Sequence, residues 1–162
     1  MVRQRSDELD PDQLAALMGT ALDEARAATA HGDVPVGAVI ARLDTGEVVA
    51  RRHNERELAS DPTAHAEVLA LRDAAAHSGS WRLDAYVLVV TLEPCPMCAG
   101  AALAARVGLV AYGASDPKAG ALGTLYHLGA DPRLNHEVPV VDGIRAPECA
   151  GLLTEFFAER RS

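Results

Sequence analysis

Several features are scarce in this 162-residue sequence. It has three cysteines, two of them in one Cys-x-x-Cys, which is a poor disulfide framework. Lys118 is the only lysine among 15 basic residues, and the formal net charge of -8 argues against a broad electrostatic grip on phosphates. No apolar run is long enough to span a bilayer, and the N-terminus leads into no apolar signal segment. We therefore expect a cytoplasmic protein without membrane contact, in which any nucleic-acid site is local.

The rest of the composition favours one globular domain. With 49% hydrophobic and 23% charged residues, the chain can form a core but is too short for two ordinary domains. We expect a single domain over residues 1–162, with residues 1–9 as a flexible, polar lead-in.

Apolar periodicity predicts a helix and a hairpin in the first third of the chain. Asp10-Pro11 is typical of a helix start, and apolar residues at helical spacing follow it to about Gly32. Two β-branched runs, 36–41 and 47–50, are separated by a turn and predict a β-hairpin.

Helices and strands also alternate in the remainder. Asp61-Pro62 repeats the start signal and predicts a helix that carries His65 and Glu67 in its first turn. The uninterrupted apolar run 85–90 predicts a central strand that is covered on both faces. The later segments are predicted as a helix, a strand, a final strand and a closing helix, at 96–105, 107–112, 138–141 and 147–160. This order predicts an α/β layered domain with helices on both faces of the sheet.

Two short motifs carry the chemistry: His65-Ala66-Glu67 and Pro94-Cys95-Pro96-Met97-Cys98. One histidine and two cysteines supply three ligands of a tetrahedral zinc site, and a catalytic zinc keeps its fourth position for water. Residues three apart lie on one helix face, so Cys95 and Cys98 can aim both sulfurs at one point. Both motifs lie at predicted helix N-termini, where the partial positive charge favours thiolate over thiol.

Glu67 is the acidic residue of these motifs that is not assigned as a metal ligand. It lies two residues after the ligand histidine and is placed to move protons to and from a zinc-activated water, which indicates hydrolytic deamination. The plain alternatives are a solvated helix face for His65 and Glu67, and a pair of packed core thiols for Cys95 and Cys98. Either motif alone is a weak signal, whereas both in this order favour a zinc enzyme.

Over most of its length the sequence resembles the bacterial tRNA-specific adenosine deaminases, within the cytidine deaminase-like zinc fold. A His-x-Glu together with a Pro-Cys-x-x-Cys is the known signature of zinc deaminases. The matching stretches are 34–39, Asn54, 61–67, 91–100, 113–114, Asp116, Lys118, 120–121, Gly123, 134–136 and 148–150.

The resemblance implies a three-layer fold with a five-stranded mixed sheet flanked by helices, a homodimer, and one zinc ion per subunit. It implies conversion of the wobble adenosine of a tRNA anticodon to inosine. Carried over to this sequence, it makes His65, Cys95 and Cys98 the zinc ligands and Glu67 the proton shuttle.

The resemblance also implies substrate contacts. Asn54 and Asn135 would form hydrogen bonds with the flipped nucleotide, and Val36 would line the base pocket. Asp116 and Lys118 fall in the loop that family members place against the sugar and phosphate of the anticodon loop. Without the resemblance, the two asparagines would be residues chosen for turn chemistry.

Two alternatives remain open. Ser115 stands where many members have arginine, and Glu55-Arg56 stands where another member has Arg-Pro, so positive charge is reduced along the expected RNA path. These departures and the negative net charge favour a small-molecule deaminase that acts on guanine, cytosine or a free nucleoside such as cytidine.

The other alternative is an inactive partner subunit with a structural zinc. The presence of Glu67 argues against it, since a structural site closes its fourth position with a protein ligand.

Overall fold

The computed structural model describes residues 9–161, so residues 1–8 of the predicted lead-in lie outside the described part. Leu9, the last residue of that lead-in, is 7% exposed and belongs to the core. Within the described range, no helix combines the length and the apolar character needed to cross a membrane.

Helix α1 (Pro11–Ala28) confirms the first predicted helix. Asp10 caps it, because its side chain accepts from the Gln13 backbone N–H at 2.8 Å while the Gln13 side chain accepts from the Asp10 N–H at 2.9 Å. A short 3-10 turn, η2 (Thr29–His31), follows, and the helical segment ends at Gly32, whose φ of 77° is left-handed.

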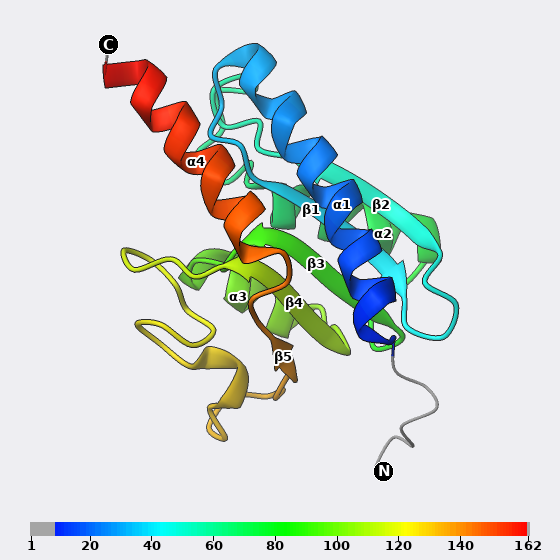
Figure 1. Ribbon diagram of the computed structural model, residues 1–162. Coiled ribbons are helices and arrows are strands. Elements are labelled where there is room, and N and C mark those ends of the chain that lie inside the picture. Colours follow the sequence, from blue (N-terminus) through cyan, green and yellow to red (C-terminus); the bar gives the residue numbers. More distant parts are fainter. Residues whose placement is uncertain (1–8, 162) are drawn as a thin grey trace.

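Five strands form one mixed sheet in the order β2-β1-β3-β4-β5, as expected (Figure 1). They are β1 (Gly37–Arg42), β2 (Val48–His53), β3 (Tyr86–Leu92), β4 (Leu109–Ala114) and β5 (Val140–Val141). Strand β1 is antiparallel to both β2 and β3, whereas β3, β4 and β5 run parallel. The apolar run predicted as the central strand is β3.

Helices cover both faces of the sheet and complete three layers (Figure 1). Successive side chains of a strand point to opposite faces. Accordingly, Val87 and Val89 of β3 pack toward α1 and α4 (Ala146–Arg161). Leu88 and Val90 pack toward α2 (Ala66–Ser78) and α3 (Pro96–Ala104). Both faces of β3 are therefore apolar, which explains its uninterrupted hydrophobic sequence.

Gly37 allows α1 to lie directly against β1. A Cβ atom at this position would overlap the backbone carbonyl oxygen of Ala21 in α1. No rotamer change relieves a clash with a backbone atom, so the helix could not approach the sheet this closely with any other residue here.

The predicted start of the second helix at Asp61-Pro62 is wrong. Asp61 instead forms a turn, since its carboxylate accepts from both the backbone N–H and the hydroxyl of Thr63 at 2.8 Å. Helix α2 begins at Ala66, with His65 in the N-cap position. Glu67 remains in the first turn, whereas His65 lies just before it.

Candidate active site

Two helix N-termini meet at the candidate site. His65 precedes α2, Cys95 precedes α3, and Cys98 lies in the first turn of α3. Their ligand atoms lie within 4.8 Å of one another, the one such group found in residues 9–161. The Nδ1 atom of His65 is 3.7 Å from the sulfur of Cys95 and 3.5 Å from that of Cys98.

These distances fit a tetrahedral metal site. With Zn–S bonds of about 2.3 Å and a Zn–N bond of about 2.0 Å, tetrahedral angles separate nitrogen from sulfur by about 3.5 Å. Cys98 is fully buried, while His65 and Cys95 are half-buried at the wall of a pocket. The group has three members and a side open to the pocket, which is the pattern of a catalytic rather than a structural metal site.

The two thiols differ in acidity because they interact. The hydrogen bond with Cys98 and the hydrogen bond with His65 together lower the pKa of Cys95 to about 3. The hydrogen bond between the two thiols raises the pKa of Cys98, and burial adds to this effect. Cys95 is thus the thiolate of the pair and Cys98 holds the proton until a metal ion displaces it.

Glu67 lies beside this group in the first turn of α2 and is 4% exposed. Burial raises the pKa of its carboxyl group, because the charged form loses its hydration. A carboxyl group with a raised pKa exchanges protons more readily near neutral pH than an exposed glutamate does.

A pocket of about 180 Å³ opens above these residues. It includes three of the predicted substrate contacts, Val36, Asn54 and Asp116. Lys118 and Asn135 are exposed and lie outside its lining, so their predicted roles stay predictions. The lining residues are Val34, Val36, Asn54, Arg56, His65, Glu67, Leu92, Glu93, Cys95, Asp116 and Ala119.

Asn54 connects β2 to the start of α2. Its Oδ1 accepts from the backbone N–H of Ala66 at 2.9 Å, and its Nδ2 donates to the carbonyl of Val34 at 3.1 Å. The first contact satisfies one of the free N–H groups at the helix N-terminus. Asn54 therefore holds the residues on either side of Ala66, which are His65 and Glu67.

Glu93 is a site residue to which the sequence analysis assigned no role. It is 2% exposed, lines the pocket, and accepts from the backbone N–H groups of Asp116, Leu122 and Thr124, each at 3.1 Å. The Thr124 hydroxyl donates to it as well. A Cβ atom on Gly120 would overlap the Glu93 carboxylate, so this glycine is required. The only sequence signal was the position of Glu93 directly before the Pro-Cys-x-x-Cys motif.

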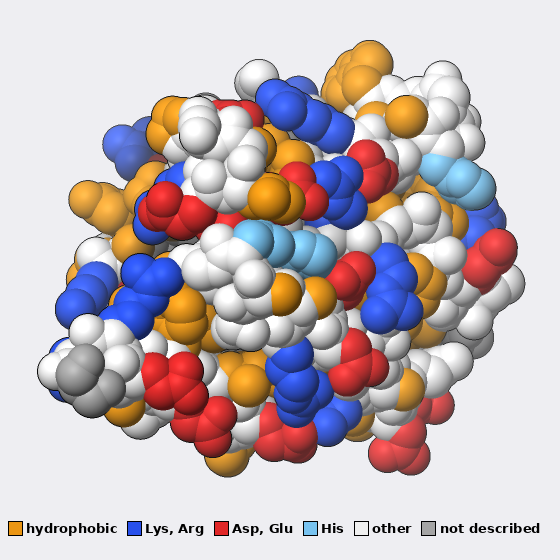
Figure 2. Space-filling model, turned by 90° about the horizontal axis from the view of Figure 1, so that it is seen from above, with side chains coloured by type: hydrophobic (Ala, Val, Ile, Leu, Met, Phe, Trp, Pro, Cys, Tyr) orange, Lys and Arg blue, Asp and Glu red, His pale blue; other side chains and the backbone are white. Residues whose placement is uncertain are grey.

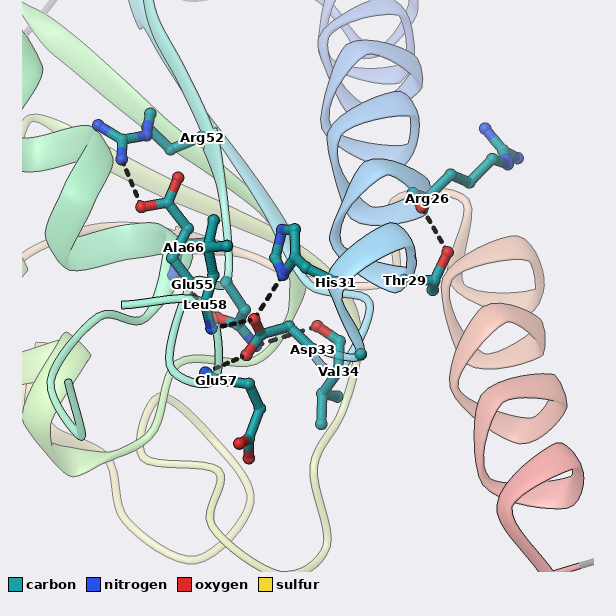
Figure 3. A network of polar contacts seen from close by, with 12 residues as sticks. Arg26, Thr29, His31, Asp33, Val34, Arg52, Glu55, Glu57, Leu58 and Ala66 are labelled. Atoms are coloured by element: carbon teal, nitrogen blue, oxygen red, sulfur yellow. Dashed lines mark hydrogen bonds and ion pairs between the residues drawn. The ribbon is translucent and has the colours of Figure 1, made fainter. Parts of the chain in front are cut away.

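Arg56 is the second residue that the sequence analysis left without a site role. It lies in the loop between β2 and α2, and Asp33 anchors that loop (Figure 3). The Asp33 carboxylate is 2% exposed and accepts from the N–H groups of Glu57 at 2.8 Å and Leu58 at 3.2 Å. It also lies 2.6 Å from Nδ1 of His31. Burial by itself would raise the pKa of Asp33, but these hydrogen bonds outweigh it and hold the pKa below its usual value.

Charges of both signs are interspersed on the face seen in Figure 2, which shows no broad area of Lys and Arg alone. This agrees with the net charge of -8. Any electrostatic attraction of a polyanion to this face must come from a few local groups.

A family model described as MafB19-like deaminase matches residues 13–161. The match spans the sheet, all four α-helices except the start of α1, and the His/Cys/Cys group with Glu67. The chain therefore belongs to the MafB19-like deaminase family.

Individual relatives are consistent with this class. The chain is 48% identical over 144 residues to a tRNA-specific adenosine deaminase of Bacillus subtilis (strain 168), which covers 89% of this chain and 88% of that protein. A solved tRNA:A34 deaminase structure, reported for A-to-I editing at the wobble position, is 40% identical with a TM-score of 0.81. It covers 85% of this chain and 99% of the other. These matches confirm the resemblance inferred from the sequence.

A second group of structures shares the fold. Guanine deaminase from Nitrosomonas europaea is 26% identical, with a TM-score of 0.75 and coverage of 98% of both chains. The same scaffold therefore occurs in proteins named for different substrates.

Proposed function

We propose that this chain is a zinc-dependent hydrolytic deaminase that converts adenosine to inosine at the wobble position of a tRNA anticodon. One observation supports the proposal most directly. The three candidate metal-ligand atoms of His65, Cys95 and Cys98 lie close together, and the buried carboxyl group of Glu67 lies beside them at a small pocket. The similarity to proteins named for tRNA adenosine deamination supports the choice of substrate. An adenosine in an anticodon loop would enter the pocket flipped out of its stack.

The residues of the site divide the chemistry between them. A zinc ion bound by Nδ1 of His65 and the two sulfurs would lower the pKa of a water molecule to roughly 7. Glu67 accepts a proton from the water that attacks C6 of the adenine. It passes this proton to the ring nitrogen. It then accepts the second proton of the same water from the hydroxyl now bound to C6 and gives it to the amino group, which leaves as ammonia while C6 becomes a carbonyl.

The pocket walls offer groups for recognising the nucleotide. A carboxamide has two donor hydrogens and two acceptor lone pairs. Asn54 uses one of each on Val34 and Ala66, so one donor and one acceptor remain for the substrate. Val36 is 5% exposed and provides an apolar wall for the base.

The loop after β4 offers contacts to the sugar and phosphate. The Oδ1 atom of Asp116 accepts from the N–H groups of Lys118 at 2.9 Å and Ala119 at 3.3 Å, which leaves Oδ2 for a sugar hydroxyl. A 2′-hydroxyl at this place would distinguish RNA from DNA. We assign Lys118 to a neighbouring phosphate and Asn135 to a further hydrogen bond with the nucleotide.

The alternative function is deamination of a free base such as guanine. It is favoured by the similarity to the Nitrosomonas europaea guanine deaminase over 98% of the chain and by the acidic composition. The two functions differ in what lies outside the base pocket, because only the RNA substrate requires contacts to sugars and phosphates.

One parallel assay tests the proposal. The zinc-loaded protein is incubated with an anticodon stem-loop, its DNA analogue, adenosine, cytidine and guanine, and both inosine and ammonia are measured. We expect inosine in the stem-loop and little turnover of free bases. Turnover of guanine with an unchanged stem-loop would instead establish the alternative, and a zinc-loaded protein inert on all five would favour the inactive-subunit hypothesis.

We further propose a homodimer with one zinc ion per subunit, acting on tRNA in the cytoplasm and folded as a single domain. The similarity to proteins named for tRNA deamination supports the tRNA substrate, and its extent over most of both chains supports the single domain. The homodimer, the zinc stoichiometry and the cytoplasm are what the resemblance to that family implies. Light scattering coupled to size-exclusion chromatography should give twice the 17.0 kDa mass of the chain. A monomer across the micromolar range would contradict the dimer.

A further inference from the structure

Arg56 is the one lysine or arginine in the lining of the described pocket. The remaining ionisable lining residues are His65, Cys95 and the carboxyl groups of Glu67, Glu93 and Asp116. The Glu93 carboxylate is already enclosed by backbone and hydroxyl donors. A substrate that enters this pocket therefore meets a single guanidinium group at its mouth.

The Arg56 side chain is exposed, and no hydrogen bond or ion pair joins it to another residue in the described part of the chain. Arg52, near the end of β2, differs from Arg56 because its side chain is paired. Its guanidinium contacts Glu55 at 2.9 Å and Asp73 at 3.0 Å. Glu55 is thus paired with Arg52 and does not neutralise Arg56. The dipeptide Glu55-Arg56 keeps a positive charge at the pocket, contrary to what its sequence indicated.

The backbone around Arg56 is held from both sides. Asn54 binds Val34 and Ala66, and the Arg56 carbonyl accepts from the N–H of Asp61 at 3.1 Å. Directly after Arg56, the buried Asp33 carboxylate holds the next two N–H groups, as Figure 3 shows. The guanidinium group is therefore carried by an anchored loop, which reduces the entropy lost on binding a ligand.

We infer that Arg56 binds a backbone phosphate of the RNA next to the nucleotide whose base enters the pocket, an assignment that rests on the proposed function. A guanidinium group forms two parallel hydrogen bonds with a phosphate, which fixes both distance and orientation. Arg56 would thereby position the nucleotide relative to Glu67 and the metal ligands without contacting the reacting atoms. In a protein of net charge -8, such a local contact supplies attraction that the surface as a whole does not.

The test compares zinc-loaded Arg56→Gln, Arg56→Lys and Arg82→Gln. Arg82 is the matched control, because it is exposed, is paired with Asp84, and precedes β3, whereas the pocket lies beyond the other end of that strand. Binding of a fluorescent stem-loop is measured by anisotropy over a salt series, with Glu67→Gln in each protein to prevent turnover. Rates on the stem-loop and on free adenosine are measured with Glu67 present, and zinc content and thermal unfolding check the fold.

We expect Arg56→Gln to weaken binding about tenfold at low salt and to reduce the slope of log affinity against log salt by about 0.7, the value for one phosphate on a single strand. Arg56→Lys should keep most of the slope, and Arg82→Gln should match the unsubstituted protein. Any activity on free adenosine should be unchanged, since adenosine has no phosphate.

The outcomes separate this inference from the proposed function. If the stem-loop is deaminated but Arg56→Gln behaves as Arg82→Gln does, the phosphate contact is wrong and the function stands. If binding depends on Arg56 but no inosine forms, the contact stands and the function is wrong. If the unsubstituted protein does not bind the stem-loop at low salt, both are overturned.

Discussion

At the scale of single residues, the pKa of a buried carboxyl group depends on whether hydrogen-bond donors replace the water that burial removes. Glu67 is 4% exposed and its pKa is raised by burial, whereas the equally buried Asp33 has a lowered pKa because three donors surround it. Two buried carboxyl groups thus serve different purposes. Glu67 can exchange a proton, and Asp33 stays ionised and holds a loop.

Replacing Glu67 by glutamine should remove the proton carrier and leave the metal ligands in place. We expect deamination to fall by about two to four orders of magnitude, the usual contribution of general acid-base catalysis. Inosine formation and zinc content are measured together, with the exposed Glu47→Gln as a control. Activity within tenfold of the unsubstituted protein would show that Glu67 is not the shuttle.

Asp33→Asn should destabilise the protein in a pH-dependent way. Because the folded-state pKa of Asp33 lies below its ordinary value of 3.8, its carboxylate stabilises the fold above that pH. This contribution is lost as the pH falls through the folded-state pKa. Urea unfolding at pH 7 should show a loss of about 2 kcal/mol for a buried charged acceptor.

The difference in stability between Asp33→Asn and the unsubstituted protein should narrow as the pH falls below the ordinary pKa of 3.8. Asp44→Asn serves as a control, since its carboxylate pairs with Arg42 at the surface and contributes less. A pH-independent loss for Asp33→Asn would contradict an ionised Asp33.

At the scale of elements, α1 and α2 show two ways in which a helix start is determined. The N-terminal cap of α1 is local, since Asp10 and Gln13 are three residues apart. The start of α2 depends on Asn54, twelve residues earlier in the sequence, which binds the Ala66 N–H. Sequence patterns detect the first kind of cap and miss the second.

Gly37→Ala tests the contact between α1 and β1. The new methyl group would overlap the Ala21 carbonyl oxygen, and overpacking typically costs about 1–3 kcal/mol or more. Gly151→Ala in α4 is the control, because its Cβ atom would meet nothing within 4 Å. It should stabilise the helix by about 0.5–1 kcal/mol. Thermal unfolding measures both changes, and equal melting temperatures for the two variants would contradict the close approach.

At the scale of the whole molecule, the proposed metal joins two helices that lie on the same face of the sheet. Only the folded chain brings His65 and the two cysteines together, so metal binding should stabilise the fold. A chelator should abolish activity and lower the melting temperature, and added zinc should restore both. Cys98→Ser should lose the metal, whereas Cys149→Ala, a buried thiol in α4, should retain it.

The pH dependence of metal binding follows from the thiols. The pKa of Cys95 is lowered to about 3, so it is already a thiolate at neutral pH, whereas the raised pKa of Cys98 means that it releases a proton on binding. Zinc affinity should therefore rise with pH, and the cysteine pair should release about one proton near pH 7. Calorimetry in buffers of different ionisation enthalpy measures the protons released by the whole site, to which His65 adds its own because its hydrogen bond with Cys95 raises its pKa. A zinc affinity that does not rise with pH would contradict a protonated Cys98.

Much of the fold could be predicted because its signals are local. Helix α1, the β1–β2 hairpin and the central β3 each follow from periodicity over adjacent residues. The types of metal ligand followed from the His-x-Glu and Cys-x-x-Cys spacings. The donors around Glu93 could not be predicted, since they come from a loop more than twenty residues further along the chain.

The amino-acid sequence by itself determined which chemistry is available: two thiols and an imidazole for a metal, a carboxyl group for protons, and apolar runs that must be buried on both faces. The tertiary structure decided how these groups are used. It caps α2 through Asn54, removes water from Glu67, and turns Arg56 rather than Glu55 toward the pocket. Hydration, ion pairing and distance depend on neighbours that are remote in sequence, and only packing brings those neighbours together.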